Sequence, residues 1–348
     1  MKPASKRPTS LPERNGVIPS SLPFPVVGIG ASAGGLSALK TFFEQMPLDS
    51  GMAFVIVLHL SPDHDSVADH IIQSSTSMPV RQVNDTCPIE PNNVYVISPA
   101  SQLSMNDGYL RVEATRRQLG NHVAIDLFFR DLADVHKEYA YCVVLSGTGS
   151  DGAVGLSRIK EQGGVTIVQA PEDAEFDGMP LAAISTGLVD VVLPVGEIPQ
   201  KLVELWLNSK TIKLPPPHDM DMTTNTPELE RAGTEQALQD ILLLLRTRTG
   251  HDFKHYKRAT VLRRIERRLQ VTAQPNLKAY FSYLEDNPEE AKLLLGDMLI
   301  GVTNFFRDRE AFEALERHVL STLMGGESDR PKREEVRIWS AGCSSGEE

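Results

Sequence analysis

Ser32 lies in a glycine-rich turn (GASAGG, residues 30–35) between an apolar run and a helical pattern. A serine on a sharp strand-to-helix turn is one way in which α/β folds present a nucleophilic hydroxyl. The flanking glycines permit strained backbone angles and leave space for a substrate. The next backbone amide, that of Ala33, is placed at a helix N-terminus to hold an oxyanion. The turn therefore indicates nucleophilic catalysis, although a tight turn with an incidental serine fits the same letters.

The same turn nearly matches a dinucleotide-binding loop. That fingerprint requires a glycine where this chain has Ala33, and an acidic residue at the end of the second strand. The second apolar run (AFVIVL, residues 53–58) ends at His59 instead. A nucleotide-dependent dehydrogenase is therefore the third interpretation, after the two function classes set out below.

His59 and Asp151 also follow predicted strands. Asp151 lies in the glycine-rich loop SGTGSDG (residues 146–152), after the apolar run CVVL. The carboxyl ends of strands border the ligand crevice in open α/β sheets, so the sheet can bring Ser32, His59 and Asp151 together. A nucleophilic serine needs a base, and a histidine base needs an orienting carboxylate. The chain order Ser, His, Asp differs from those of chymotrypsin, subtilisin and the α/β-hydrolases, which indicates another hydrolase lineage.

Six ordered segments resemble the catalytic domain of the bacterial chemotaxis protein-glutamate methylesterases (CheB-type), over about residues 23–206: VVGIGASAGG, VIVLHLSPDH, NNVYVISPA, HVAIDLFFRDLA, VLSGTGSDGAVGL and QAPEDAEFDGMPLAAISTGLVDVVLP. The resemblance implies a serine hydrolase that cleaves glutamate methyl esters on chemoreceptor signalling helices, and that in many members also deamidates glutamines there. It implies Ser32 as the nucleophile, His59 as the general base and Asp151 as the orienting group. It implies no cofactor and no metal for this reaction.

The expected oxyanion side of the site departs from the family pattern. The family often has a methionine where this chain has Thr148, and a threonine where it has Ala33. Both residues, with Gly149, belong to the expected oxyanion and active-site loops. Because backbone donors survive such exchanges, we expect an altered rate or specificity and not a loss of activity.

Strand patterns alternate with helical patterns through the first 207 residues. Strands are expected at about 24–29, 53–58, 93–97, 109–112, 141–145, 164–168 and 189–193, and helices at 35–46, 123–137, 153–162 and 197–207. The alternation predicts an α/β fold with a doubly wound, mostly parallel sheet. We assign 1–22 to a disordered tail, 23–207 to the methylesterase domain and 208–233 to a proline-containing linker.

A basic helical region follows the expected linker. Leu238, Ile241 and Leu245 have helical spacing, and a helix is expected over 260–271. Seven Lys or Arg residues and one acid lie between positions 254 and 268. In an acidic chain this stripe favours an anionic partner, although a solvated helix face with extended arginines is the alternative.

The basic helix, VTNFFRD (residues 302–308) and RIWSAGCSSGEE (residues 337–348) together resemble the chemoreceptor protein-glutamate O-methyltransferases (CheR-type), over about residues 234–348. The resemblance implies S-adenosylmethionine as the cofactor of the complete methyltransferase. It implies cofactor contacts from Thr303, Arg307 and Glu347. It also implies that an arginine stripe docks on the acidic receptor surface, which in this chain comprises Arg263, Arg264, Arg267 and Arg268.

We assign 234–290 to the helical domain of that family and 291–348 to the beginning of its Rossmann-like, cofactor-binding domain. The sequence ends at Glu348, soon after the first strand and loop of that domain. We therefore expect a piece of a longer fusion or a truncated gene product, with methyltransferase activity only in a longer chain. No receiver domain is expected before Phe24, and control by a partner or by the methyltransferase half is a hypothesis.

Composition fits a cytoplasmic enzyme. The three cysteines are odd in number and far apart, which argues against a disulfide framework or a zinc cluster. No apolar run approaches the ~20 residues of a membrane helix, and the net charge of −11 argues against nucleic-acid binding. Chemoreceptor cytoplasmic helices are the expected partners, with sensor kinases or response regulators as further candidates.

Two function classes remain open at this point. One is an esterase that uses Ser32, His59 and Asp151, and the other is a catalytically idle module that docks a receptor or regulator. The intact triad motifs favour the enzyme, because an idle scaffold has no physical need for all three.

Overall fold

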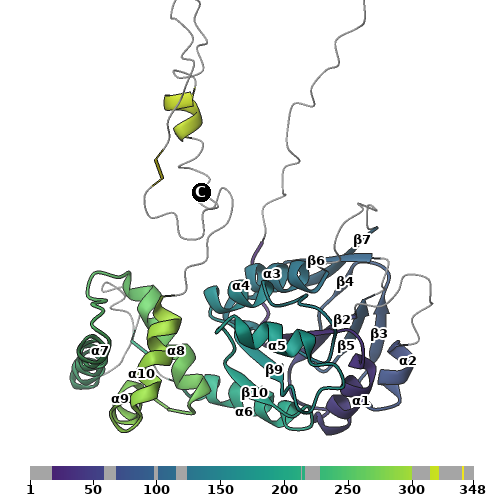
Figure 1. Ribbon diagram of the computed structural model, residues 1–348, viewed down its shortest axis with the longest axis horizontal. Coiled ribbons are helices and arrows are strands. Elements are labelled where there is room, and N and C mark those ends of the chain that lie inside the picture. Colours follow the sequence, from purple (N-terminus) through teal and green to yellow (C-terminus); the bar gives the residue numbers. More distant parts are fainter. Residues whose placement is uncertain are drawn as a thin grey trace, which may run out of the picture. The chain divides into compact units, whose positions relative to one another are not determined.

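The computed structural model describes residues 18–58, 68–97, 101–114, 124–212, 214–215, 228–299, 314–320 and 339–340. The chain divides into a compact unit of residues 1–299 and a smaller unit of residues 300–348. In the larger unit, an α/β domain is followed by a group of helices (Figure 1). In the smaller unit, the described residues include one π-helical turn, Glu316–Leu320.

A parallel sheet forms the centre of the α/β domain, with the strand order β10-β9-β8-β1-β2-β5-β3. The strands are β1 (Val26–Ala31), β2 (Ala53–Leu58), β3 (Val80–Val83), β5 (Val94–Ile97), β8 (Ala140–Val144), β9 (Val165–Gln169) and β10 (Val191–Leu193). Strands from early in the chain lie on one side of β1 and later strands lie on the other. The strand order therefore reverses between β1 and β8, which is where open α/β sheets bind ligands.

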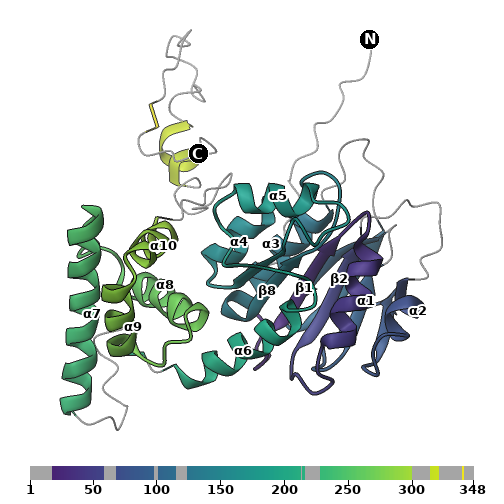
Figure 2. The same cartoon turned by 60° about the horizontal axis from the view of Figure 1, so that its bottom comes forward.

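Helices cover both faces of this sheet (Figure 2), as the alternating sequence pattern predicted. One face carries α1 (Gly35–Gln45), α2 (Ala68–Gln73) and α6 (Ile198–Thr211), whose apolar side chains share a core with Val27 and Ile29 of β1. The other face carries α3 (Ala124–His136), α4 (Gly155–Glu161) and α5 (Gly178–Ser185). The predicted doubly wound fold is confirmed.

Gly28 and Gly30 bring α3 unusually close to the central strand. A Cβ on Gly28 would lie 2.7 Å from side-chain carbons of Phe128 and Leu132, and a Cβ on Gly30 would lie 2.4 Å from Cγ2 of Ile125. Side chains at these two positions would push the helix away from β1. The glycines that resemble part of a dinucleotide-binding loop therefore serve helix-to-sheet packing.

A second, antiparallel sheet contains the strand that the sequence predicted at 109–112. Its strands are β4 (Cys87–Pro88), β6 (Ser101–Asn106) and β7 (Tyr109–Ala114), in the order β4-β7-β6. Asp107 and Gly108 join β6 to β7 with φ values of 46° and 75°. Two consecutive positive φ angles suit a tight hairpin, so the run expected at 109–112 pairs with its neighbour in sequence.

Three domain bounds differ from the sequence-based assignment. The last residues of the expected tail are held by the body, because Ser20 N donates to Val135 O at 2.8 Å and Asp107 N donates to Ile18 O at 3.1 Å. The tail prediction for residues 1–17 lies outside the described residues. The expected linker 208–233 overlaps the end of α6 and the start of α7 (Glu228–Thr249). The boundary expected at 290/291 falls inside α10 (Pro288–Met298).

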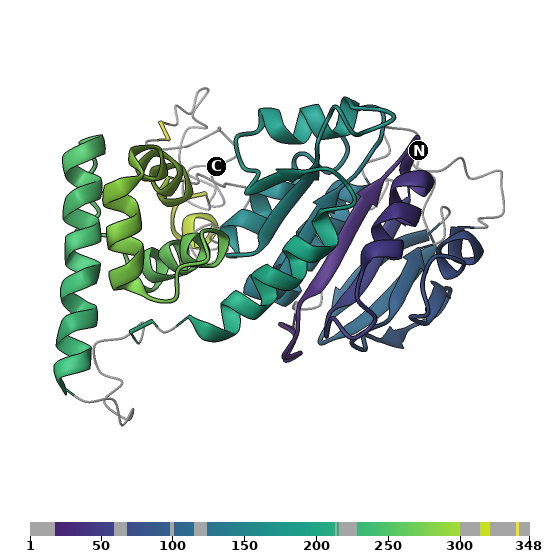
Figure 3. The same cartoon turned by 90° about the horizontal axis from the view of Figure 1, so that it is seen from below.

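Helices α7 (Glu228–Thr249), α8 (Arg258–Val271), α9 (Leu277–Asp286) and α10 form the all-helical domain that the sequence predicted. Figure 3 shows them as a green group beyond the end of α6. Their shared core includes Ile241, Ile265, Tyr280 and Leu294. At the start of α9 the side chain of Asn276 accepts from Ala279 N at 3.0 Å, which caps the helix.

Candidate active site

Ser32 lies at the carboxyl end of β1, directly before α1, as the sequence predicted. It is 8% exposed. Its backbone N–H donates to Ser146 O at 3.0 Å, and its carbonyl accepts from Gly35 N at 2.9 Å. Gly34 caps the helix with φ +72°, and a Cβ there would lie 2.7 Å from Ser146 Oγ. The turn therefore needs glycine both for its backbone angle and for the close approach of the next strand end.

The loop after β8 contacts this turn from the neighbouring strand. A Cβ on Gly147 would lie 3.0 Å from Ser32 Cβ and 2.1 Å from Met179 Sδ, so only glycine fits there. Thr148 and Gly149 follow and are exposed, and Gly149 has φ +85°. The structure thus brings the predicted active-site loop to the side of Ser32.

Ser146 is a buried polar residue of this site that the sequence analysis did not single out. Its hydroxyl donates to Ala33 O and accepts from Phe176 N, both at 2.9 Å. It therefore ties the Ser32 turn to the loop that precedes α5. Its backbone N–H donates to Gln169 Oε1 at 2.8 Å, and Gln169 in turn donates to Asp173 Oδ2 at 2.8 Å. The sequence feature that could have indicated this contact is Gln169, a polar residue at the end of the apolar run VTIVQ.

Asp151 is held at the amino end of α3. Its two carboxylate oxygens accept from Ile125 N at 3.1 Å and from Asp126 N at 2.9 Å. This places a carboxylate at the positive end of the helix dipole and satisfies two of its end N–H groups. Asp126 makes a similar contact with the amino end of α4, because its carboxylate accepts from Gly155 N at 2.7 Å. Burial raises the pKa of Asp126, and the charge of Asp151 adds to the rise.

His59 lies outside the described residues, but its strand is described. Leu58, the last residue of β2, pairs with Ala31, the last residue of β1. Of the three predicted triad members, the described part of the chain therefore locates Ser32 and Asp151. The predicted cofactor contacts Thr303, Arg307 and Glu347 also lie outside the described residues.

The four arginines expected to dock on a receptor, Arg263, Arg264, Arg267 and Arg268, do not form an exposed stripe in this structure. Arg264, Arg267 and Arg268 are 5%, 3% and 5% exposed, and Arg263 is half-buried. Arg268 forms a two-pronged ion pair with Glu290 of α10, with N–O distances of 2.7 and 2.6 Å. Helical periodicity marks a charged face but does not reveal which carboxylates elsewhere in the chain cover it.

No group of three or more His, Cys, Asp or Glu side chains within the described ranges is arranged to hold a metal ion. Those ranges also contain no helix with the length and apolar character of a membrane span.

The CheB methylesterase family model matches residues 27–202, which is half of the chain. This chain belongs to the CheB methylesterase family. The all-alpha domain of CheR methyltransferases matches residues 236–299, and the SAM binding domain of CheR methyltransferases matches residues 301–348. The match to the all-alpha domain ends at Leu299, which is the last residue of the larger compact unit.

Similar proteins support the methylesterase part of this assignment. An uncharacterized 104.1 kDa protein of Rhodobacter capsulatus is 33% identical over 80% of this chain. This chain spans only 30% of that protein's length. A putative protein-glutamate methylesterase/protein-glutamine glutaminase of Leptospira interrogans is 32% identical over 53% of this chain and 97% of its own. The crystal structure of the Thermotoga maritima CheB methylesterase catalytic domain aligns with a TM-score of 0.50 and 27% identity, over 53% of this chain and all of that one.

Proposed function

We propose that this chain hydrolyses the methyl esters of glutamate side chains on chemoreceptor cytoplasmic helices, and that it also deamidates glutamines there. Ser32 is the nucleophile, His59 the general base and Asp151 the group that orients the base. The observation that carries the proposal is the meeting of the Ser32 turn with the β8 loop at the point where the strand order reverses. The names of relatives as protein-glutamate methylesterase/protein-glutamine glutaminase support the substrate class.

The proposed reaction has two steps. Ser32 Oγ attacks the ester carbonyl carbon while His59 takes the hydroxyl proton. The oxyanion that forms is held by backbone N–H groups of the Ala33 turn and of the Thr148–Gly149 loop. The C–O bond to the methoxy group breaks, and His59 returns the proton so that methanol leaves. Water then attacks the acyl-serine by the same route, which releases the glutamate carboxylate and restores Ser32.

The methyltransferase part is proposed to use S-adenosylmethionine in a longer chain, with contacts from Thr303, Arg307 and Glu347. This cofactor supplies the methyl group that re-esterifies the same glutamates. The match of residues 301–348 to the SAM binding domain of CheR methyltransferases supports the cofactor. A cytoplasmic location, with receptor helices as substrates and sensor kinases or response regulators as further partners, follows from the proposed reaction.

Methanol release from a carboxyl-methylated chemoreceptor signalling domain tests the proposal. Ser32→Ala should reduce the rate at least about 10³-fold, because it removes the attacking atom. Ser37→Ala is the matched control, since Ser37 is exposed on α1, five positions further along. Equal rates for the parent and Ser32→Ala would exclude Ser32 as the nucleophile. No release by the parent on several receptors would favour the interaction module instead.

A further inference from the structure

Helix α8 contacts the α/β domain through a buried chain of alternating charges. The side chain of Asp190, just before β10, has no exposed surface. It accepts from Arg267 of α8 at 2.5 Å and from Lys160 Nζ of α4 at 2.7 Å. Lys160 Nζ also lies 2.6 Å from Asp297 Oδ1 of α10. Two of the three ion pairs in this chain, Arg267–Asp190 and Lys160–Asp297, therefore join the helical domain to the α/β domain. The third pair, Asp190–Lys160, lies within the α/β domain.

Further contacts extend this surface, which we call the α8 interface. Arg264 donates to the backbone carbonyl of Lys160. Gln270 donates to the hydroxyl of Tyr141 and, at 3.1 Å, to Leu205 O. The stem of Arg263 covers Gly163, where a Cβ would lie 3.0 Å from Arg263 Cγ. The cationic face of α8 is therefore occupied by the methylesterase domain.

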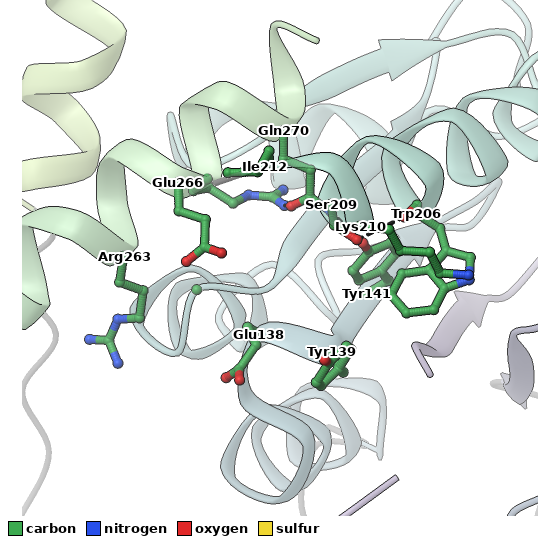
Figure 4. A pocket seen from close by; sticks show the side chains of 12 residues that line it. Glu138, Tyr139, Tyr141, Trp206, Ser209, Lys210, Ile212, Arg263, Glu266 and Gln270 are labelled. Carbon is green, nitrogen blue, oxygen red and sulfur yellow. Dashed lines mark hydrogen bonds between the residues drawn. The ribbon is translucent and has the colours of Figure 1, made fainter. Parts of the chain in front are cut away.

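The α8 interface is polar and incompletely satisfied. Among the described residues, no hydrogen-bond partner reaches the buried Nε atoms of Arg263, Arg264 and Arg267 or the buried Oδ2 of Asp297. A cavity of about 140 Å³ lies beside Arg263 and Arg267 (Figure 4), and Glu138, Trp206 and Glu266 also line it. Buried ion pairs recover little more than their desolvation penalty, and polar contacts between domains separate readily. The geometry is that of a specific contact that can open.

Electrostatics point the same way. Burial alone would raise the pKa of Asp190, but Arg267 and Lys160 beside it hold that pKa well below its usual value. Burial, with Arg263 alongside, lowers the pKa of Arg264 to about 10. The interface therefore holds an ionised carboxylate that pairs with Arg267, while Arg264 donates its hydrogen bond to the backbone carbonyl of Lys160. An acidic partner would offer Arg264 a carboxylate as well.

We propose that the cationic face of α8 has two mutually exclusive partners, the methylesterase domain within this chain and an acidic helical surface of the substrate protein. The inference rests on the proposed function, because ester hydrolysis converts neutral methyl esters into the carboxylates that arginines bind. In this structure Asp190 of the methylesterase domain pairs with Arg267 on that face of α8. Separation of the α8 interface presents Arg263, Arg264 and Arg267 to the substrate surface, so that the methylesterase domain controls access to the methyltransferase half.

The binding test uses a fluorescein-labelled amphipathic helical peptide with a glutamate-rich face, and its glutamine counterpart. Lys160→Met and Asp297→Asn each break the Lys160–Asp297 pair but leave the arginines of α8 in place. Each variant should bind the glutamate peptide at least about tenfold more tightly than the parent by fluorescence anisotropy, which is about 1.4 kcal/mol. The glutamine peptide should show no gain.

Matched controls change the same residue types, lysine to methionine and aspartate to asparagine, at positions away from the α8 interface. Lys40→Met removes an exposed ion pair with Glu44 on α1, and Asp240→Asn alters an exposed hydrogen bond on α7. Neither should change peptide affinity. Arg264→Ala together with Arg267→Ala should abolish the gain in the Lys160→Met background. A gain that survives these two substitutions, or that the controls share, would overturn the proposal.

Trp206 reports opening in the otherwise unaltered chain. It lines the cavity and is 7% exposed, and the other tryptophan, Trp339, can be replaced by phenylalanine. Saturating glutamate peptide should move Trp206 emission to longer wavelength. Peptide binding without that change would refute mutual exclusion, even if Lys160→Met failed to fold. Ser32→Ala should keep the emission change while losing ester hydrolysis, so the two proposals can fail separately.

Discussion

Ala31 pairs with Leu58 in the parallel ladder between β1 and β2. Ser32 and His59 are the residues that directly follow this pair in the sequence. On the other side of β1, Val144 of β8 pairs with Gly30, and the β8 chain continues into the loop that carries Asp151. Because both faces of the sheet are buried, a one-residue slip would turn each strand's side chains to the wrong face. The sheet register therefore brings to one edge the ends of the three strands that lead to the proposed catalytic residues.

Ser146→Ala should lower kcat roughly tenfold with little change in KM, because one hydroxyl holds both the Ala33 carbonyl and the Phe176 amide. The loss of these buried hydrogen bonds should also reduce unfolding free energy by about 1–3 kcal/mol. Methanol-release kinetics and urea unfolding measure the two effects. Ser157→Ala is the control, since its hydroxyl bonds a carbonyl on the surface of α4. A drop in stability with unchanged kcat would remove Ser146 from the positioning of the site.

Asp151→Asn should lower kcat by roughly 10²–10⁴-fold, as expected for the loss of the carboxylate that orients a catalytic base. Because Asp151 also accepts two hydrogen bonds at the amino end of α3, we expect a loss of unfolding free energy of about 1 kcal/mol. Asp134→Asn alters a carboxylate near the other end of the same helix, where it pairs with Arg158. It should leave methanol release near the parental rate. Comparable losses in both variants would assign Asp151 a structural role alone.

Gly30→Ala should destabilise the methylesterase domain by about 1–3 kcal/mol, because the new methyl group would meet Cγ2 of Ile125 at 2.4 Å. Gly296→Ala is the opposite case. Among the described residues, no heavy atom other than those of its sequence neighbours and its own helix backbone lies within 4 Å of a Cβ added there on α10. The substitution should therefore stabilise the helix by up to about 1 kcal/mol. Thermal and urea unfolding compare the two. Equal changes in unfolding free energy for the two variants would show that the close packing of α3 on β1 does not stabilise the domain.

His136 should make the fold sensitive to acid. It is 3% exposed, and burial lowers its pKa to about 4. The unfolded chain takes up a proton on this residue near its ordinary pKa of about 6.5, before the folded chain does. The contribution of neutral His136 to the free energy of unfolding is therefore fully present above about pH 6.5. Up to about 3 kcal/mol of it is lost as the pH falls toward 4.

The non-titrating variant His136→Leu isolates this contribution. Urea unfolding at several pH values should give a shallower decline of unfolding free energy between pH 6.5 and 4 than in the parent. Its absolute stability at neutral pH can differ without affecting that comparison. Parallel curves for the two proteins would show that His136 is not the source of the acid sensitivity.

The sequence by itself determined the architecture and the placement of Ser32. Apolar runs bounded by glycine-rich turns can bury both faces only as a parallel sheet between helices, and α8 with its neighbours has unmistakable helical spacing. These patterns are local, so a single sequence contains them. The pairing of β7 with β6 depended on turn geometry, and the sequence analysis predicted the strand at 109–112 without that partner.

Only the tertiary structure decided what surrounds the chemistry. Gly28 and Gly30 must be glycines because α3, almost 100 positions later in the chain, packs directly on them. Arg267 of α8 is covered because Asp190, at the edge of another domain's sheet, pairs with it. Periodicity shows which side chains share a face, but the cost of burying a charge depends on its partner, and that partner is set by contacts between residues distant in the chain.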